Sequence, residues 1–182
     1  MSQIPEPLEP PPPSERPART YAQPFELALM MGIVIVDQAT KAIVQRMLPH
    51  GESHNLIPGF LDLTHMHNTG AAFGLLNAAK FPYKPLVMVG IAALALVAIA
   101  AYATQLGFHE RMARCGLALI LGGAFGNLID RALATYVVDF VDVYWGTTHF
   151  WAFNVADAAI TIGAIMVLLD MIGLGRNASH SV

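Results

Sequence analysis

Four carboxylates lie among almost wholly apolar residues between positions 122 and 157: Asp130, Asp139, Asp142 and Asp157. An ionised carboxylate is costly at membrane depth, so such residues indicate a functional site. Two carboxyl groups that are held close together cannot both ionise, and they share one proton. One can then activate water as a base while the other polarises a scissile carbonyl as an acid. This is the chemistry of aspartic proteolysis, and we single out Asp139 and Asp157 for it.

The composition places the chain in a membrane. Of its 182 residues, 55% are hydrophobic and 13% are charged, which is too little polar surface to cover a soluble globule of this size. The formal net charge is −3 and the basic residues are scattered, so nothing favours nucleic acid as a partner. The single cysteine, Cys115, excludes an internal disulfide. Helices that cross a bilayer must therefore position the carboxylates.

Four segments are predicted to be transmembrane helices. The first, residues 25–48, would be about 36 Å long at about 1.5 Å per residue, for a bilayer core of about 30 Å. The second, residues 86–106, contains no charged residue. The third begins near Cys115 and reaches Asp130 and Arg131, and the fourth runs from about residue 153 to residue 172. The expected fold is an all-α membrane protein of four helices with a small extracytoplasmic cap that contains β structure.

Charged residues interrupt the first and third of these helices. Asp37 and Lys41 are four residues apart and can form an ion pair. This pair either fixes the depth of the helix or belongs near the active site, and the sequence leaves both readings open. Lys41 and Arg46 can extend toward the nearer interface. Asp130 is expected to form a structural ion pair with Arg131, and closely spaced glycines allow another backbone to approach the third helix: Gly122, Gly123 and Gly126.

The remaining segments lie outside the bilayer in this interpretation. Residues 1–24 form a disordered, proline-rich cytoplasmic tail, residues 25–173 form the transmembrane domain, and residues 174–182 form a short cytoplasmic tail. The cap covers residues 49–85.

Within the cap, alternation over residues 60–67 predicts a strand, Asn68-Thr69-Gly70 predicts a turn, and residues 71–83 could form a small interfacial helix. Residues 132–152 are predicted to be a loop that carries Asp142 into solvent. The cap also holds four histidines, which are interpreted as solvated loop residues and not as metal ligands, because no Cys or HExxH motif accompanies them: His50, His54, His65 and His67. We expect no metal and no other cofactor.

Four spans put both termini on one side of the membrane. That side carries more arginine, so the positive-inside rule places the termini in the cytoplasm. The outer end of the first helix, the cap, the outer end of the third helix and the start of the fourth helix then meet at one interface. A set of polar residues converges there, near the outer face of the membrane: Lys41, Asn68, Asp130, Arg131, Asp139, Asn154 and Asp157.

Other nucleophiles fit this picture poorly. Cys115 is expected near the cytoplasmic end of the third helix, away from the polar interface. No serine lies in an apolar helix with a base; the serines are at positions 2, 14, 53, 179 and 181. A pair of carboxylates remains.

Five motifs give the chain a family resemblance. They are DQATK (37–41), NTGAAF (68–73), GGAFGNLIDR (122–131), VVDF (137–140) and FNVAD (153–157). In order and spacing they resemble those of bacterial lipoprotein signal peptidase, also called signal peptidase II, over roughly residues 25–172. The proline-rich tail departs from the common pattern of that family.

The resemblance implies an intramembrane aspartic endopeptidase of the cytoplasmic (inner) membrane. Its substrates would be prolipoproteins that carry diacylglycerol on their lipobox cysteine, and it would cut just before that cysteine. Asp139 and Asp157 would be the catalytic dyad. The substrate pocket would be shaped by a further set of residues: Asn68, Asn127, Asp130, Arg131 and Asn154, with Asp37 and Lys41 nearby.

Two other classes of function use the same residues differently. A proton-coupled transporter could use the acids as a relay, but they lie at one end of the bundle and no inverted repeat is apparent. A membrane assembly factor without enzymatic activity would not need two adjacent titratable carboxylates. Membrane lipids are the other expected partners.

Overall fold

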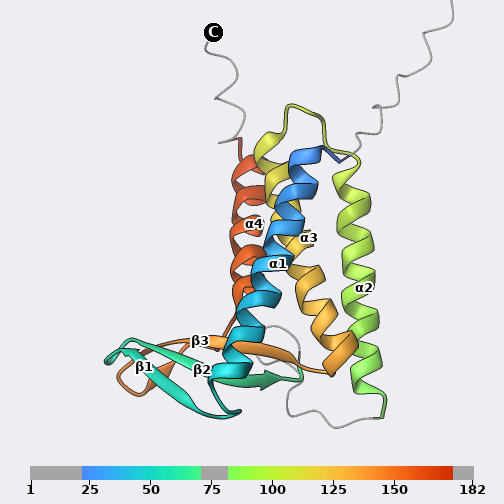
Figure 1. Ribbon diagram of the computed structural model, residues 1–182. Coiled ribbons are helices and arrows are strands. Elements are labelled where there is room, and N and C mark those ends of the chain that lie inside the picture. The colour runs from blue at the N-terminus through green and yellow to red at the C-terminus, as the bar shows by residue number, and fades with distance from the viewer. Residues whose placement is uncertain (1–21, 71–81, 174–182) are drawn as a thin grey trace, which may run out of the picture.

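The computed structural model describes residues 22–70 and 82–173. Within these ranges four helices stand side by side, and an antiparallel sheet lies across one end of them (Figure 1). The helices are α1 (Pro24–Met47), α2 (Lys84–Ala103), α3 (Arg111–Ala134) and α4 (Val155–Met171). The strands are β1 (Ser53–Ile57), β2 (Leu61–Asn68), β3 (Val137–Trp145) and β4 (Thr148–His149). The described chain starts and ends at the end of the bundle opposite the sheet.

Local sequence signals set the helix ends. Pro24 starts α1, where its missing N–H costs nothing, and Glu26 accepts the backbone N–H of Gln23 at 2.9 Å. Pro49 follows the end of this helix. The residue before a proline is disfavoured in the helical backbone conformation, so the helix cannot extend to Leu48. Asn154 caps α4. The predicted helix at 71–83 and both tails lie largely outside the described residues.

α3 is the central helix and packs against the other three. Glycines bring the backbones into contact. A Cβ built on Gly116 would lie 2.7 Å from the carbonyl oxygen of Gly163 on α4, and one built on Gly126 would lie 2.6 Å from Asp37 Oδ2 on α1. A Cβ on Gly123 would meet the backbone of α4. Close approach of another backbone is confirmed for two of the predicted glycines: Gly122, which faces Met30 of α1, and Gly123. Gly126 instead faces the side chain of Asp37.

Three of the described helices are long and apolar enough to cross a membrane: α1, α2 and α3. α4 is apolar but has 17 residues. Large apolar side chains point outward from the bundle, for example Leu94 on α2, which is 71% exposed. Such a surface needs an apolar solvent. The described residues therefore hold four helices, as predicted, of which three are candidate membrane spans.

The four strands form one sheet in the order β1-β2-β3-β4, and every neighbouring pair is antiparallel. The predicted strand at 60–67 is confirmed as β2. The prediction of a loop over 132–152 is wrong, because α3 continues to Ala134 and β3 and β4 follow it. The sequence VVDFVDVYW is rich in β-branched and aromatic residues, which favour a strand once a partner strand is beside them. The cap strand β2 is that partner.

One further boundary differs from the prediction. The third helix, expected to begin near Cys115, already begins at Arg111. A bidentate ion pair with Glu26, with N–O distances of 2.6 and 2.8 Å, allows the charged Arg114 to lie within the helix inside an apolar bundle.

Candidate active site

Asp139 and Asp157 lie on neighbouring elements, β3 and the first turn of α4. A short backbone pairing joins these elements. Phe153 donates its N–H to the carbonyl oxygen of Val141 at 3.0 Å, and it accepts the N–H of Val141 at 2.9 Å. α4 begins two residues later. The start of α4 is therefore fixed beside the part of β3 that carries Asp139.

Asn154 connects the two carboxyl groups. Its side-chain Nδ2 donates to Asp139 Oδ1 at 2.7 Å, and its backbone N–H donates to Asp157 Oδ2 at 3.3 Å. Its Oδ1 accepts the backbone N–H of Asp157 at 3.0 Å. This last bond is the cap of α4, so the residue that starts the helix also orients both acids.

Two more amides complete the hydrogen bonds of the pair. Asn68 Nδ2, at the end of β2, donates to Asp139 Oδ2 at 3.0 Å. Asn127 Nδ2, on α3, donates to Asp157 Oδ1 at 2.9 Å. Each of the four carboxyl oxygens thus accepts one N–H, and the donors come from three different elements. The geometry holds two acids in fixed orientations.

Asp139 is 3% exposed. Burial raises the pKa of Asp139 to about 7, and the nearby charge of Asp157 acts in the same direction. The hydrogen bonds from Asn68 and Asn154 and the charge of Lys41 oppose this rise but do not cancel it. Near neutral pH this carboxyl group can therefore hold a proton while its partner is charged, as an acid–base pair requires.

A buried lysine lies behind the pair. Lys41 is 3% exposed, and its Nζ lies 2.8 Å from Asp37 Oδ2, 2.9 Å from Asn127 Oδ1 and 2.6 Å from Asp130 Oδ2. The predicted ion pair between Asp37 and Lys41 is confirmed. The alternative in which Lys41 extends to the interface is wrong, because two carboxylates and an amide hold its ammonium inside the bundle. Asp37, fully buried, also accepts the N–H of Ala156 at 3.0 Å.

The ion pair predicted between Asp130 and Arg131 is not the one that forms. Asp130 pairs with Lys41 instead. Neighbouring residues of a helix point about 100° apart, so Asp130 faces α1 while Arg131 faces the sheet. Arg131 donates to the carbonyl oxygens of Asn127 at 3.2 Å and Gly70 at 3.0 Å. The second of these bonds ties the turn after Asn68 to α3.

The prediction for Asp142 is also wrong. It lies on β3 and not in a loop, its side chain is 16% exposed, and its Oδ2 lies 2.8 Å from His149 Nδ1. The hairpin between β3 and β4 brings this pair together. Asp142 does not contact Asp139, which is three positions earlier and so points to the other face of the strand.

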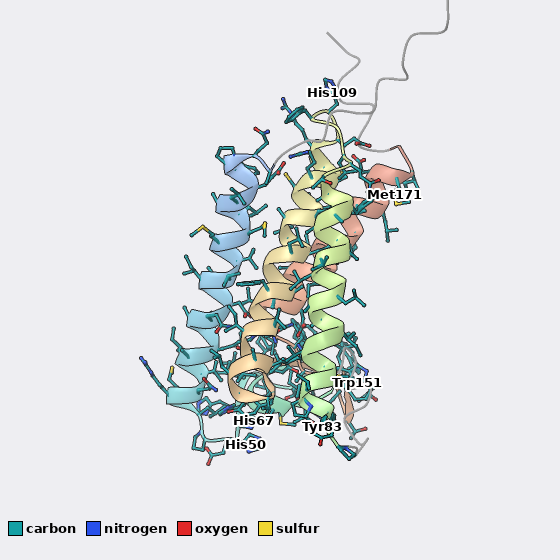
Figure 2. The ribbon with its side chains drawn as sticks, turned by 90° about the vertical axis from the view of Figure 1, so that its right-hand side faces the viewer. His50, His67, Tyr83, His109, Trp151 and Met171 are labelled. Carbon is teal, nitrogen blue, oxygen red and sulfur yellow. The ribbon has the colours of Figure 1, made fainter. Side chains whose placement is uncertain are left out.

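Three of the four cap histidines form a cluster, contrary to the expectation of solvated loop residues. The ring of His67 lies between those of His50 and Tyr136, with centroid distances of 3.9 and 3.6 Å. His65 is 6% exposed and its Nδ1 lies 2.8 Å from the carbonyl oxygen of Leu48. In ranges 22–70 and 82–173 no group of three or more His, Cys, Asp or Glu residues is arranged to hold a metal ion. Figure 2 shows His50 and His67 at the sheet end of the bundle, far from His109.

Sequence reasoning missed Gln38. Its Nε2 donates to Asp130 Oδ1 at 2.9 Å and to the carbonyl oxygen of Gly126 at 3.2 Å, so it links α1 to α3 beside Lys41. A polar amide in the middle of an apolar span was the signal that could have found it.

The fold and the site together define a multi-pass membrane protein with a pair of buried, hydrogen-bonded carboxyl groups at one end of its helices. Residues 29–173 match the family described as signal peptidase (SPase) II, peptidase family A8. The chain belongs to this family, and it is an aspartic peptidase with lipoprotein signal peptidase activity.

Relatives and solved structures agree with this assignment. The chain is 44% identical to the lipoprotein signal peptidase of Geobacter metallireducens over 146 residues, which cover 80% of this chain and 89% of that protein. It is 38% identical to the lipoprotein signal peptidase of Solibacter usitatus over 148 residues, or 81% of this chain and 90% of that protein. A bacterial membrane enzyme solved by the in meso method at 1.9 Å resolution superposes with a TM-score of 0.73 and 29% identity, over 86% of this chain and 97% of that one.

Proposed function

We propose that Asp139 and Asp157 are the catalytic dyad of this peptidase. The single observation that carries the proposal is the bridge made by Asn154, which donates one N–H to each carboxyl group. A structural acid pair would be neutralised by cations, whereas these two groups are held mainly by neutral amides. Neutral donors orient a carboxyl group and favour its ionised form less strongly than an adjacent cation would, so the pair stays able to exchange protons.

The two acids take different roles. Asp157 lies in the first turn of α4, where the helix dipole stabilises a negative charge, so it is the base. Asp139 lies on a strand, has a pKa raised to about 7, and is the acid. Asp157 takes a proton from water, the water oxygen attacks the scissile carbonyl carbon, and Asp139 gives its proton to the carbonyl oxygen.

The tetrahedral intermediate then collapses and both acids return to their starting states. Asp157 gives its proton to the leaving nitrogen as the C–N bond breaks. Asp139 takes a proton from one hydroxyl of the intermediate as the new carboxyl group forms. One water is consumed, and no other reactant is needed.

We propose further that the substrate is a prolipoprotein with diacylglycerol on its lipobox cysteine, cut before that cysteine. The position of the acids supports this, because they lie at the end of apolar helices, where a peptide at the interface and acyl chains among the helices can be held together. Asn68 and Arg131 are partly exposed and are the residues assigned to contact the peptide. The other predicted pocket residues form the inner wall of the site: Asp37, Lys41, Asn127, Asp130 and Asn154.

The topology proposed for the chain makes α4 the fourth span. Its 17 residues give about 26 Å at about 1.5 Å per residue, and the adjoining apolar residues add to this length. Arg111 and Arg114 lie at the end of the bundle opposite the sheet, which favours a cytoplasmic position for that end and for both termini. The domain is then residues 25–173 in the inner membrane, with the acids near its outer face and short tails in the cytoplasm.

The test uses the purified protein in detergent and two lipobox peptides that differ only by diacylglycerol on the cysteine. Mass spectrometry should find one cut, immediately before the lipidated cysteine, and much slower cleavage of the unlipidated peptide, because each buried CH₂ contributes about 0.8 kcal/mol to binding. Equal rates at equal peptide concentration, or a cut at another bond, would contradict the proposal.

A further inference from the structure

Three side chains hold the ammonium group of Lys41 inside the bundle. An ammonium group has three N–H donors and no acceptor. Lys41 Nζ donates to Asp37 Oδ2 at 2.8 Å and to Asn127 Oδ1 at 2.9 Å, and it forms an ion pair with Asp130 Oδ2 at 2.6 Å. Two of these partners are carboxylates, whose negative charge the ammonium group compensates. The third, Asn127, is neutral and connects Lys41 to the catalytic pair.

Because Lys41 can only donate, it decides which way the amide of Asn127 faces. A flipped amide would place Nδ2 against Nζ, and two donors would meet head to head. Asn127 must therefore present its oxygen to Lys41 and its nitrogen to Asp157, where Nδ2 lies 2.9 Å from Oδ1. Asn154 Nδ2 supports the same orientation through a longer contact of 3.3 Å to Asn127 Oδ1.

Neither acid partner depends on Lys41 alone. Asp37 also accepts the backbone N–H of Ala156 at 3.0 Å, and Asp130 accepts Gln38 Nε2 at 2.9 Å. Asn127 has less support, because its second donor is the weaker contact from Asn154. Loss of Lys41 would therefore change the orientation of Asn127, in addition to leaving an imbalance of charge.

We propose that Lys41 is a positioning residue of the dyad: through Asn127 it holds one N–H on Asp157, so that Asp157 stays ionised as the base and the shared proton stays on Asp139. This proposal rests on the dyad assigned above. The charged groups around the amide are Asp37 and Lys41 on α1, Asp130 and Arg131 on α3, Asp139 on β3 and Asp157 on α4.

The experiment measures cleavage of the lipidated peptide against pH for the wild type, Lys41→Met, Asn127→Ala and the double variant, all in detergent and corrected for folded fraction. Lys41→Met should lower kcat about tenfold or more and move the acidic limb of the profile to higher pH, since the amide of Asn127 no longer holds its N–H on Asp157. In the Asn127→Ala background, Lys41→Met should lower kcat by a further factor of about two at most. Both substitutions remove the same interaction, the N–H of Asn127 on Asp157, so their effects should not multiply.

Two further variants keep the proposal testable if Lys41→Met fails to fold. Asp37→Asn/Lys41→Met removes one negative and one positive charge together, and it should show the same shift. Asn127→Asp keeps an oxygen toward Lys41 but removes the N–H to Asp157, so the acidic limb should again move to higher pH.

Two results would overturn the role of Lys41: an unshifted profile in the folded variants, or losses from Lys41→Met and Asn127→Ala that multiply as independent effects. Either result would leave the dyad standing, because the dyad is tested separately by substitution of the two aspartates. Wild-type protein that cut at another bond would instead contradict the proposed function itself.

Discussion

Asn154 Nδ2 lies 2.7 Å from Asp139 Oδ1, and the same side chain caps the helix in which the second acid lies. An N-cap contributes about 1 kcal/mol to helix stability. Asn154 also links β3 to the start of α4 at the end of the bundle. The stability of α4 and the geometry of the site are therefore set by one residue.

Asp139→Asn and Asp157→Asn should each abolish cleavage while the protein stays folded. Asparagine keeps the size of the side chain and one acceptor oxygen, but it can neither take a proton from water nor deliver one. The double variant should lose no more than the single variants, because the two residues act as one unit. The measurement is the cleavage rate of detergent-solubilised variants matched for folded fraction.

Asp142→Asn is the matched control on the same strand. Its side chain bonds to His149 and not to the site, so the cleavage rate should stay near that of the wild type. Near-normal activity in a variant at Asp139 or Asp157 would exclude the dyad, even if the fold were unchanged.

Asp139→Asn should also stabilise the protein at high pH. The carboxyl group of Asp139 has a pKa of about 7 in the folded protein and about 3.9 in an unfolded chain. Between these values the folded protein binds a proton that the unfolded chain has lost, so stability falls as pH rises through this range. The melting temperature of the variant should exceed that of the wild type most at pH 8, and the difference should shrink toward pH 4. A constant difference across this range would contradict the raised pKa.

Chelation should leave cleavage intact. The proposed mechanism uses two carboxyl groups and one water, and no step calls for a metal ion. Peptide cleavage measured before and after treatment with EDTA should give equal rates. Loss of activity that one added metal restored would show that the mechanism is incomplete.

The histidine cluster should make the cap sensitive to acid. Burial lowers the pKa of His67, and His50 and His65 lower it further. An unfolded chain binds a proton near pH 6.5 and the folded protein does so only at lower pH, so stability is lost as pH falls below about 6.5. His67→Phe keeps the stacking on Tyr136 and should reduce this loss between pH 8 and pH 5.

His54→Phe is the control for this cluster, because His54 is exposed on β1. Melting temperatures of the two variants should therefore differ in their slope with pH. Parallel curves for both variants and the wild type would exclude a role of the cluster in acid sensitivity.

Much of the architecture followed from local sequence. Long apolar segments indicated the helices, and glycines on α3 marked the sites of close packing. These features depend on neighbouring residues and on the surrounding solvent, so periodicity and composition reveal them. Asp139 and Asp157 were also visible, because a carboxyl group in an apolar segment is costly wherever the chain places it.

Only the tertiary structure decided which groups are paired. From the sequence Asp130 was assigned to its neighbour Arg131, but the helix turns these side chains apart and Lys41 of α1 is nearer. The segment after α3 looked like a loop because its partner strand is 69 to 82 residues earlier, from the pairs Asn68–Val137 and Leu61–Val143, and a strand is stabilised by hydrogen bonds to such a partner. Contacts between distant segments depend on how helices and strands pack, which no local pattern encodes. The amides of Asn68, Asn127 and Asn154 are oriented by such contacts, so their roles at the dyad were visible only in the folded chain.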